Sequence, residues 1–248
     1  GNFKTWKGLA SWCESLMEGR NELPKETVSY IKNNFASIEN PRDRVKAIYE
    51  WMQQRTRYVS IQLGIGGWQP MPAKEVDQNG YGDCKALTNY MKAALSVADI
   101  NSFYSLVFSG VGDEVDPQFP AQSFNHVILN VPMGEDTIWL ECTNPKAPFG
   151  QMGRGTIGKY SLVVNGEESK LVRVKSIDNG QRIRINNTLY IDAPLNNTTT
   201  VAGQITYSEF YYLPGLELVE LSHKNLKEFY YDNISKSALG LNEIHVVA

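Results

Sequence analysis

The sequence lacks both the long apolar runs of a membrane protein and the basic surplus of a nucleic-acid-binding protein. No stretch approaches the roughly 18 to 20 uninterrupted apolar residues that a transmembrane helix requires. Lysine and arginine number 24 against 27 acidic residues, which gives a formal net charge of −3. Because phosphate binding requires a basic face, this balance argues against nucleic acid as a partner. The 248 residues, 42% of them hydrophobic, suffice for one large domain or two smaller ones.

A starting methionine is also lacking, since the chain begins with Gly1. A signal peptide would already be missing from such a chain. The last alternating run stops abruptly at Ala248, as a cut strand would. We therefore expect the chain to be part of a longer precursor, and its own residues do not define a compartment.

Cysteine and histidine are scarce, with three residues of each. Cys13, Cys84 and Cys142 cannot all pair within the chain, and they lack the CxxC spacing of a zinc site. At least one is therefore a free thiol. A single free cysteine is most often a small buried hydrophobic residue, so the surrounding sequence must decide whether any of the three is reactive.

Apolar residues three and four positions apart predict helices over much of the first hundred residues. Pro41 suits the first turn of the third helix. An extended segment is expected at 58–63, followed by a Gly- and Pro-rich loop around Trp68 at 64–76. The expected helices cover residues 6–19, 24–35, 41–55 and 84–98.

Runs typical of strands follow at 102–109, 124–132 and 137–143, and a turn at 132–136 makes a hairpin of the last two. Helices followed by an antiparallel sheet predict an α+β fold, with the helix of Cys84 packed on the sheet. We place this core domain at residues 1–160.

A smaller β-rich module is expected at 161–248, with its last strand truncated. It contains two alternating runs and then a helix with His223 and a last strand with His245. These segments cover residues 181–192, 198–210, 217–233 and 242–248.

Cys84 falls in the first turn of its predicted helix, in the segment YGDCKAL. The backbone N–H groups of a first turn have no partners within the helix and the macrodipole is positive there, which favours a thiolate. Asp83 is expected to cap the helix, and Lys85 to be solvated. The backbone N–H of Cys84 is a natural oxyanion donor. Side-chain candidates for that role are Gln78 and Trp68, whose ordinary interpretations are an exposed loop residue and a packing residue.

Cysteine catalysis also needs a base and a group that orients the base. His126, in the strand FNHVILNV, shares a sheet face with Phe124 and Ile128 and could face the helix of Cys84. Glu141 lies on the paired strand, where a carboxylate could hold the imidazole in one tautomer. Its neighbour Cys142 must point to the opposite face and is interpreted as structural. A lone strand histidine can equally be a structural residue.

YGDCKAL, FNHVILNVP and WLECTNP in this order resemble the transglutaminase-like superfamily, specifically the bacterial transglutaminase/protease core domains, over residues 40–150. The resemblance implies a papain-like site in which Cys84 attacks a carboxamide or peptide carbonyl and forms a thioester. His126 would activate the thiol, and Glu141 stands where the family usually has Asp. It implies a protein or peptide substrate, no metal or cofactor, and an exported bacterial protein of the periplasm or cell surface. The β-rich module resembles those that accompany this core.

Three hypotheses about function remain open from the sequence. The first is a cysteine peptidase, amidase or acyltransferase. The second is a catalytically degenerate binding module, because Glu141 replaces Asp and Ala86 stands where the family often has an acidic residue. The third is a redox use of the Cys84 thiol.

Overall fold

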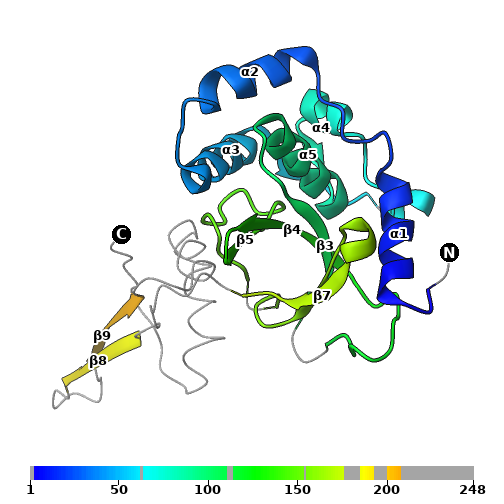
Figure 1. Ribbon diagram of the computed structural model, residues 1–248. Coiled ribbons are helices and arrows are strands. Elements are labelled where there is room, and N and C mark those ends of the chain that lie inside the picture. Colours follow the sequence, from blue (N-terminus) through cyan, green and yellow to red (C-terminus); the bar gives the residue numbers. More distant parts are fainter. Residues whose placement is uncertain are drawn as a thin grey trace. The chain divides into compact units, whose positions relative to one another are not determined.

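The computed structural model describes residues 3–61, 64–110, 114–153, 155–175, 185–192 and 200–207. The chain divides into two compact units, Gly1–Ile177 and Asp178–Ala248. The first unit combines helices with a five-stranded sheet in the order β5-β4-β3-β6-β7, in which all neighbouring strands are antiparallel. The predicted α+β class is therefore confirmed (Figure 1).

Polar caps precede three of the predicted helices, and Pro24 precedes the fourth. Thr5 accepts a hydrogen bond from the N–H of Gly8 at 3.0 Å, and Asn40 accepts one from Arg42 at 2.9 Å. Such caps satisfy backbone donors that the first helical turn leaves unpaired. Pro41 occupies the first turn of its helix, as expected. The helices are α1 (Trp6–Met17), α2 (Lys25–Phe35), α3 (Pro41–Arg55) and α5 (Cys84–Val97).

The segment expected to be a loop at 64–76 instead contains a 3₁₀ turn, η1 (Gly64–Gly67), and the start of α4 (Ala73–Asn79). Pro72 precedes α4 and Gly80 ends it with a φ of 68°, which are typical boundary signals. Seven residues contain too few turns for a helical period to be visible in the sequence. The extended segment is also shorter than predicted: β1 (Arg57–Tyr58) pairs in parallel with β2 (Tyr81–Gly82).

The first unit's sheet continues beyond the predicted domain boundary at residue 160. β6 pairs with β3, and β7 pairs with β6, so residues 161–173 belong to this sheet and the boundary moves to Ile177. Strands of four residues place only two side chains on each face, which is too few for a recognisable alternation. The strands are β3 (Phe103–Val107), β4 (His126–Met133), β5 (Asp136–Leu140), β6 (Tyr160–Val163) and β7 (Lys170–Arg173), with the turn η2 (Gly166–Glu168) before β7.

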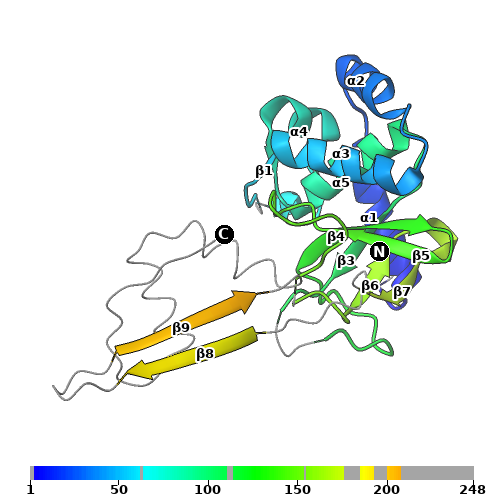
Figure 2. The ribbon, with the colours of Figure 1, turned by 90° about the vertical axis from the view of Figure 1, so that its left-hand side faces the viewer.

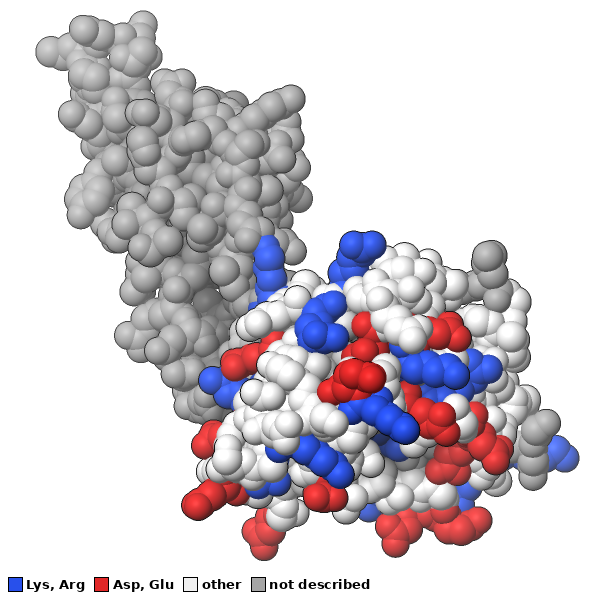
Figure 3. Space-filling view, turned by 90° about the horizontal axis from the view of Figure 1, so that it is seen from above, with Lys and Arg blue, Asp and Glu red and all other residues white. Residues whose placement is uncertain are grey.

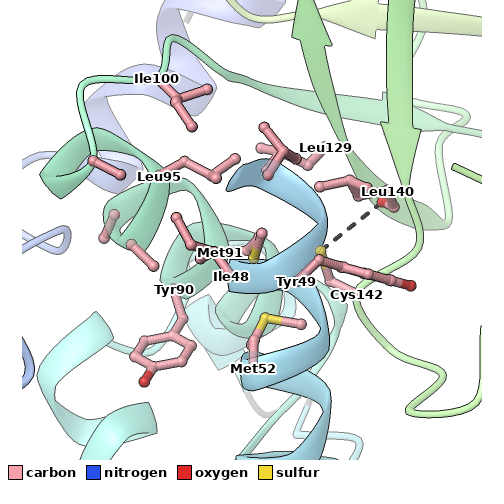
Figure 4. Close-up of a cluster of buried hydrophobic side chains, with 14 of the residues drawn as sticks. Ile48, Tyr49, Met52, Tyr90, Met91, Leu95, Ile100, Leu129, Leu140 and Cys142 are labelled. Atoms are coloured by element: carbon pink, nitrogen blue, oxygen red, sulfur yellow. Dashed lines mark hydrogen bonds between the residues drawn. The ribbon is translucent and has the colours of Figure 1, made fainter. Parts of the chain in front are cut away.

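The main core lies between the helices α2–α5 and one face of the sheet (Figures 1 and 2). Leu129 and Leu140 of the sheet meet Met91 and Leu95 of α5 in this core (Figure 4). The predicted apolar face of α5 is confirmed, because each of its members is at most 1% exposed. Those residues are Leu87, Tyr90, Met91, Ala94 and Leu95.

A polar cluster around Asp77 fixes α5 against the other helices. Both Asp77 carboxylate oxygens accept from the Thr27 hydroxyl at 3.0 Å, and one also accepts from the Tyr90 hydroxyl at 2.7 Å. Arg55 lies 3.5 Å from the same oxygen. Because Asp77 is on α4, these bonds connect α2, α3, α4 and α5 and hold the helix that carries Cys84.

The second unit contains an antiparallel hairpin of β8 (Ile185–Asp192) and β9 (Thr200–Tyr207), within the two alternating runs predicted there. The helix expected at 217–233, the strand expected at 242–248, and their histidines His223 and His245 lie outside the described residues.

The mixed surface charges and the polarity of the described helices agree with the near-neutral composition and its lack of long apolar runs. Lys and Arg are interspersed with Asp and Glu on the face of the molecule drawn in Figure 3. Within the part of the chain that the structure describes, none of the helices combines the length and apolarity needed to cross a bilayer.

Candidate active site

Cys84 is the first residue of α5, as predicted. The side chain of Asp83 caps the helix by accepting from the N–H of Ala86 at 3.0 Å. The prediction of a solvated Lys85 is wrong, because Lys85 is 5% exposed and its ammonium group pairs with the Asp83 carboxylate. Gly82 precedes Asp83, and only glycine fits there because a Cβ would come within 2.8 Å of the Ala86 Cβ. The backbone before the nucleophile candidate is therefore closely packed.

His126 joins Cys84 to Glu141. Its Nε2 lies 2.8 Å from Oε2 of Glu141, and its ring also forms a hydrogen bond with Cys84. Because Nε2 is used by Glu141, Nδ1 is the ring nitrogen that remains for the thiol. The structure thus brings together the three residues that the sequence selected, with the imidazole in the middle.

Glu141 is itself held on both ends. Its Oε1 accepts from the backbone N–H of Thr143 at 2.9 Å and from the Thr143 hydroxyl at 2.6 Å. Its backbone carbonyl accepts from the Tyr49 hydroxyl of α3 at 2.7 Å. With one oxygen bound by Thr143, the other is left to face His126, so the carboxylate has little freedom to rotate.

The strand register explains how Glu141 reaches His126. Leu129 pairs with Leu140, and extending this register by one residue sets Glu141 opposite Ile128. His126 is two residues further along, which is a diagonal neighbour at about 7–8 Å between Cα atoms, within reach of long side chains. The sequence expectation of a side-by-side pair is therefore corrected to a diagonal one.

The structure also corrects the expectation that His126 meets the helix of Cys84 across a face of the sheet. Ile128, which alternation places on the same face as His126, packs with Trp139 and Met152 in a separate cluster. Leu129, of opposite parity, packs in the core with α5. His126 is the first residue of β4, so it meets Cys84 at the end of the strand rather than across the helix-covered face.

The protonation states follow from these contacts. Burial lowers the pKa of His126, but the hydrogen bonds to Cys84 and Glu141 outweigh it and raise the pKa to about 10. Burial would raise the pKa of Glu141, but the bonds from His126 and Thr143 outweigh it and hold that pKa below its usual value. At neutral pH the pair is therefore an imidazolium and a carboxylate.

The other two thiols have no such partner. Burial, with Glu14 nearby, raises the pKa of Cys13 to about 12. Burial likewise raises the pKa of Cys142 well above its usual range. Cys142 points into the helix-covered core, which confirms its predicted structural position (Figure 4). The three thiols are similarly buried, with 5%, 6% and 4% exposure for Cys13, Cys84 and Cys142, so exposure does not distinguish them.

The two side-chain oxyanion candidates are not placed at the thiol. Gln78 is exposed on α4. Trp68 is half-buried and its ring lies 5.4 Å from that of Trp12, which borders the apolar cluster containing Cys84. In the part of the chain that the structure describes, the structure shows no hydrogen bond from either side chain to Cys84.

Sequence reasoning missed Tyr104, which lies on β3 in the same cluster as Cys84 and Cys13. Burial, reinforced by nearby Cys84, Cys13 and Asp83, raises the pKa of Tyr104 well above its usual value. Its hydroxyl therefore stays protonated beside the thiol. A tyrosine in an alternating strand carries no sequence signal that would separate this position from an ordinary core residue.

Stability is expected to fall at alkaline pH because of His126. Its pKa is raised from 6.5 to about 10 in the folded chain. The stabilisation is complete below about pH 6.5 and is lost as the pH rises through about 10. Glu141 acts in the opposite direction, since its lowered pKa stabilises the fold above pH 4.5 and this is lost as the pH falls through the folded-state value.

Urea unfolding at a series of pH values measures this effect. The difference in unfolding free energy between the wild type and His126→Gln should shrink from pH 6.5 to pH 10. A difference that stays constant over this range would show that His126 is not linked to folding through its charge.

A cysteine, a histidine and a carboxylate joined by hydrogen bonds form the class of site used in covalent cysteine catalysis, here on an α+β fold. Among the described residues no three His, Cys, Asp or Glu side chains gather as metal ligands.

A solved structure that shares this fold is a provisionally assigned protease from Parabacteroides distasonis, with 12% identity and a TM-score of 0.51 over 69% of this chain. A weaker similarity, with 16% identity and a TM-score of 0.39 over 78% of this chain, is to a provisionally assigned cysteine protease from Cytophaga hutchinsonii. This chain spans 31% of the first protein and 52% of the second. No model of a known protein family and no curated protein matches the sequence.

Proposed function

We propose that this chain is a transglutaminase-like cysteine enzyme that acts on a carboxamide or peptide bond through a thioester. The observation that carries the proposal is the hydrogen-bonded chain from Cys84 through His126 to Glu141 and Thr143. A histidine with a purely structural role needs only one hydrogen-bond partner. Here the Glu141 carboxylate, itself fixed by Thr143, orients the His126 ring against a thiol at the start of a helix. The similar protein from Parabacteroides distasonis is named as a protease, which supports the same reaction class.

The proposed reaction has two steps. The Cys84 thiolate attacks the carbonyl carbon, a C–S bond forms, and the C–N bond breaks as the His126 imidazolium gives its proton to the leaving amine. Water or a second amine then attacks the thioester, passes a proton back to His126, and releases the thiolate. Glu141 keeps the ring oriented and stabilises its charged form in both steps. The backbone N–H of Cys84, at the start of α5, is the proposed donor to the oxyanion.

An activated ester tests covalent catalysis without knowledge of the substrate. With p-nitrophenyl acetate, we expect a burst of nitrophenol equal to the enzyme concentration and one acetyl group on Cys84, detected by mass spectrometry. Cys84→Ala should abolish the burst, because the nucleophile is gone. A mixture of peptide amides, with and without a fluorescent primary amine, then separates hydrolysis from acyl transfer. Acetylation of the Cys84→Ala variant at the wild-type rate would contradict the proposal.

A second candidate is a binding module that retains the fold without turnover. The 6% exposure of Cys84 favours it, since a substrate carbonyl must reach the sulfur. The burst experiment separates the two candidates. A binding module gives neither a burst nor an acetylated Cys84, and in that case Cys84→Ala should leave cellular function intact.

A further inference from the structure

Thr88 is a fully buried polar residue on α5, one helical turn beyond Cys84. Residues four apart lie on the same side of a helix, so Thr88 follows Cys84 along the face that meets the sheet. A threonine inside a helix often bonds the carbonyl of its own preceding turn. Here the hydroxyl donates across to β4 instead, to the carbonyl oxygen of Val127 at 3.3 Å.

The contacts of this hydroxyl connect the backbone neighbours of both other site residues. Val127 directly follows His126, and the Thr88 hydroxyl also lies within hydrogen-bonding reach of the Cys142 side chain, directly after Glu141. Because the hydroxyl has a single proton and donates it to Val127, and the thiol donates to the carbonyl of Leu140 at 3.9 Å, the bond to β4 is the directional one and Cys142 is a close neighbour. Thr88 is thus a side chain on the helix of the nucleophile that contacts the segments of both the base and the carboxylate.

Stability alone is a weak reason for a hydroxyl at this position. A buried hydroxyl that is hydrogen-bonded contributes only about 1 kcal/mol after its desolvation, and an apolar side chain of the same shape can do as well. The residues around it, such as Leu87 and Met91, are apolar core. A directional bond differs from apolar packing because it fixes the position of the helix along the strand, and sliding by about 1 Å can cost roughly 100-fold in rate.

We infer that Thr88 is a positioning residue that sets Cys84 in register with His126 and Glu141. The inference rests on the proposed function for its consequence in catalysis. The positioning itself does not depend on the proposed function, because the hydroxyl would align the thiol and the imidazole whatever the substrate is.

The test compares Thr88→Val, which removes the hydroxyl and keeps the shape, with Thr88→Ser, which keeps the hydroxyl. The rate of Cys84 alkylation by iodoacetamide at pH 7 should fall about tenfold or more in Thr88→Val and stay within about threefold in Thr88→Ser. Thr27→Val is the matched control, since Thr27 is also a buried threonine but joins α2 to Asp77 of α4, and the Tyr90 bond that connects α5 to Asp77 remains. It should reduce stability in urea and leave the alkylation rate unchanged.

The His126 ring gives an independent readout by NMR titration. Misalignment weakens its bond with Cys84, so its pKa should fall from about 10 in Thr88→Val and remain there in Thr88→Ser. If wild-type Cys84 reacts fast and Thr88→Val matches it, the Thr88 inference is overturned and the proposed function stands. If wild-type Cys84 is unreactive, the proposed function fails, and a lowered His126 pKa in Thr88→Val still supports the positioning role while an unchanged one overturns it.

Discussion

Iodoacetamide at pH 7.5 is expected to alkylate Cys84 at least about 100-fold faster than Cys13 or Cys142 in the folded chain. The three thiols are buried to similar degrees, so access does not favour Cys84. Their surroundings differ instead. Burial raises the pKa of Cys13 to about 12, so it carries almost no thiolate at this pH. Cys84 has the His126 imidazolium against its sulfur, and a neighbouring cation is typical of reactive cysteines.

The variant His126→Gln separates this electrostatic cause from local flexibility. Glutamine retains a hydrogen-bonding group but carries no charge, so Cys84 alkylation should slow by about 100-fold while Cys13 is unaffected. Peptide mapping by mass spectrometry follows each cysteine separately, and urea-unfolded protein supplies the reference in which all three thiols are accessible. Equal labelling of Cys84 and Cys142 in the folded chain would refute a reactive thiol at this site.

The sequence predicts the individual helices and strands better than it predicts how they pair and pack. Polar caps before α1, α3 and α5 and the period of α5 are local signals, and the observed helices follow them. The helix α4 has boundary residues but too few turns for a visible period. The strands β6 and β7 carry no such signal, because a strand of four residues shows no period and its pairing depends on distant residues. The pairing of β6 with β3, which moves the domain boundary to Ile177, is a contact of this kind.

The same distinction applies to the candidate site. The sequence selects Cys84, His126 and Glu141 from a helix start, two paired strands and the order of the motifs, and the structure brings them together. Lys85 is misjudged, because an exposed lysine is the usual case and its buried pairing with Asp83 depends on the fold. Thr88 has no signal in the sequence at all, since a helical threonine that bonds a carbonyl of a strand looks like any other helical threonine.

Glu141→Asp is expected to weaken the site almost as much as Glu141→Ala. The sequence alone presents Glu141 as a departure from a family pattern that usually has Asp. The register reverses that interpretation, because Glu141 lies diagonal to His126 and only the longer side chain spans to Nε2 at 2.8 Å. Removing one methylene withdraws the carboxylate by more than 1 Å, and errors of that size cost roughly 100-fold in rate.

The acetylation rate of Cys84 by p-nitrophenyl acetate measures this loss, with Glu141→Gln as the control that keeps the length and removes the charge. NMR titration should show the His126 pKa falling from about 10 in all three variants, because each removes the bond or the charge that favours imidazolium. Thr143→Val should have a smaller effect in the same direction, since it removes one of the two donors that hold Oε1 and keeps the backbone N–H. Wild-type activity in Glu141→Asp would mean that the strands adjust to the shorter side chain, and the diagonal register would then not be the reason for a glutamate at this position.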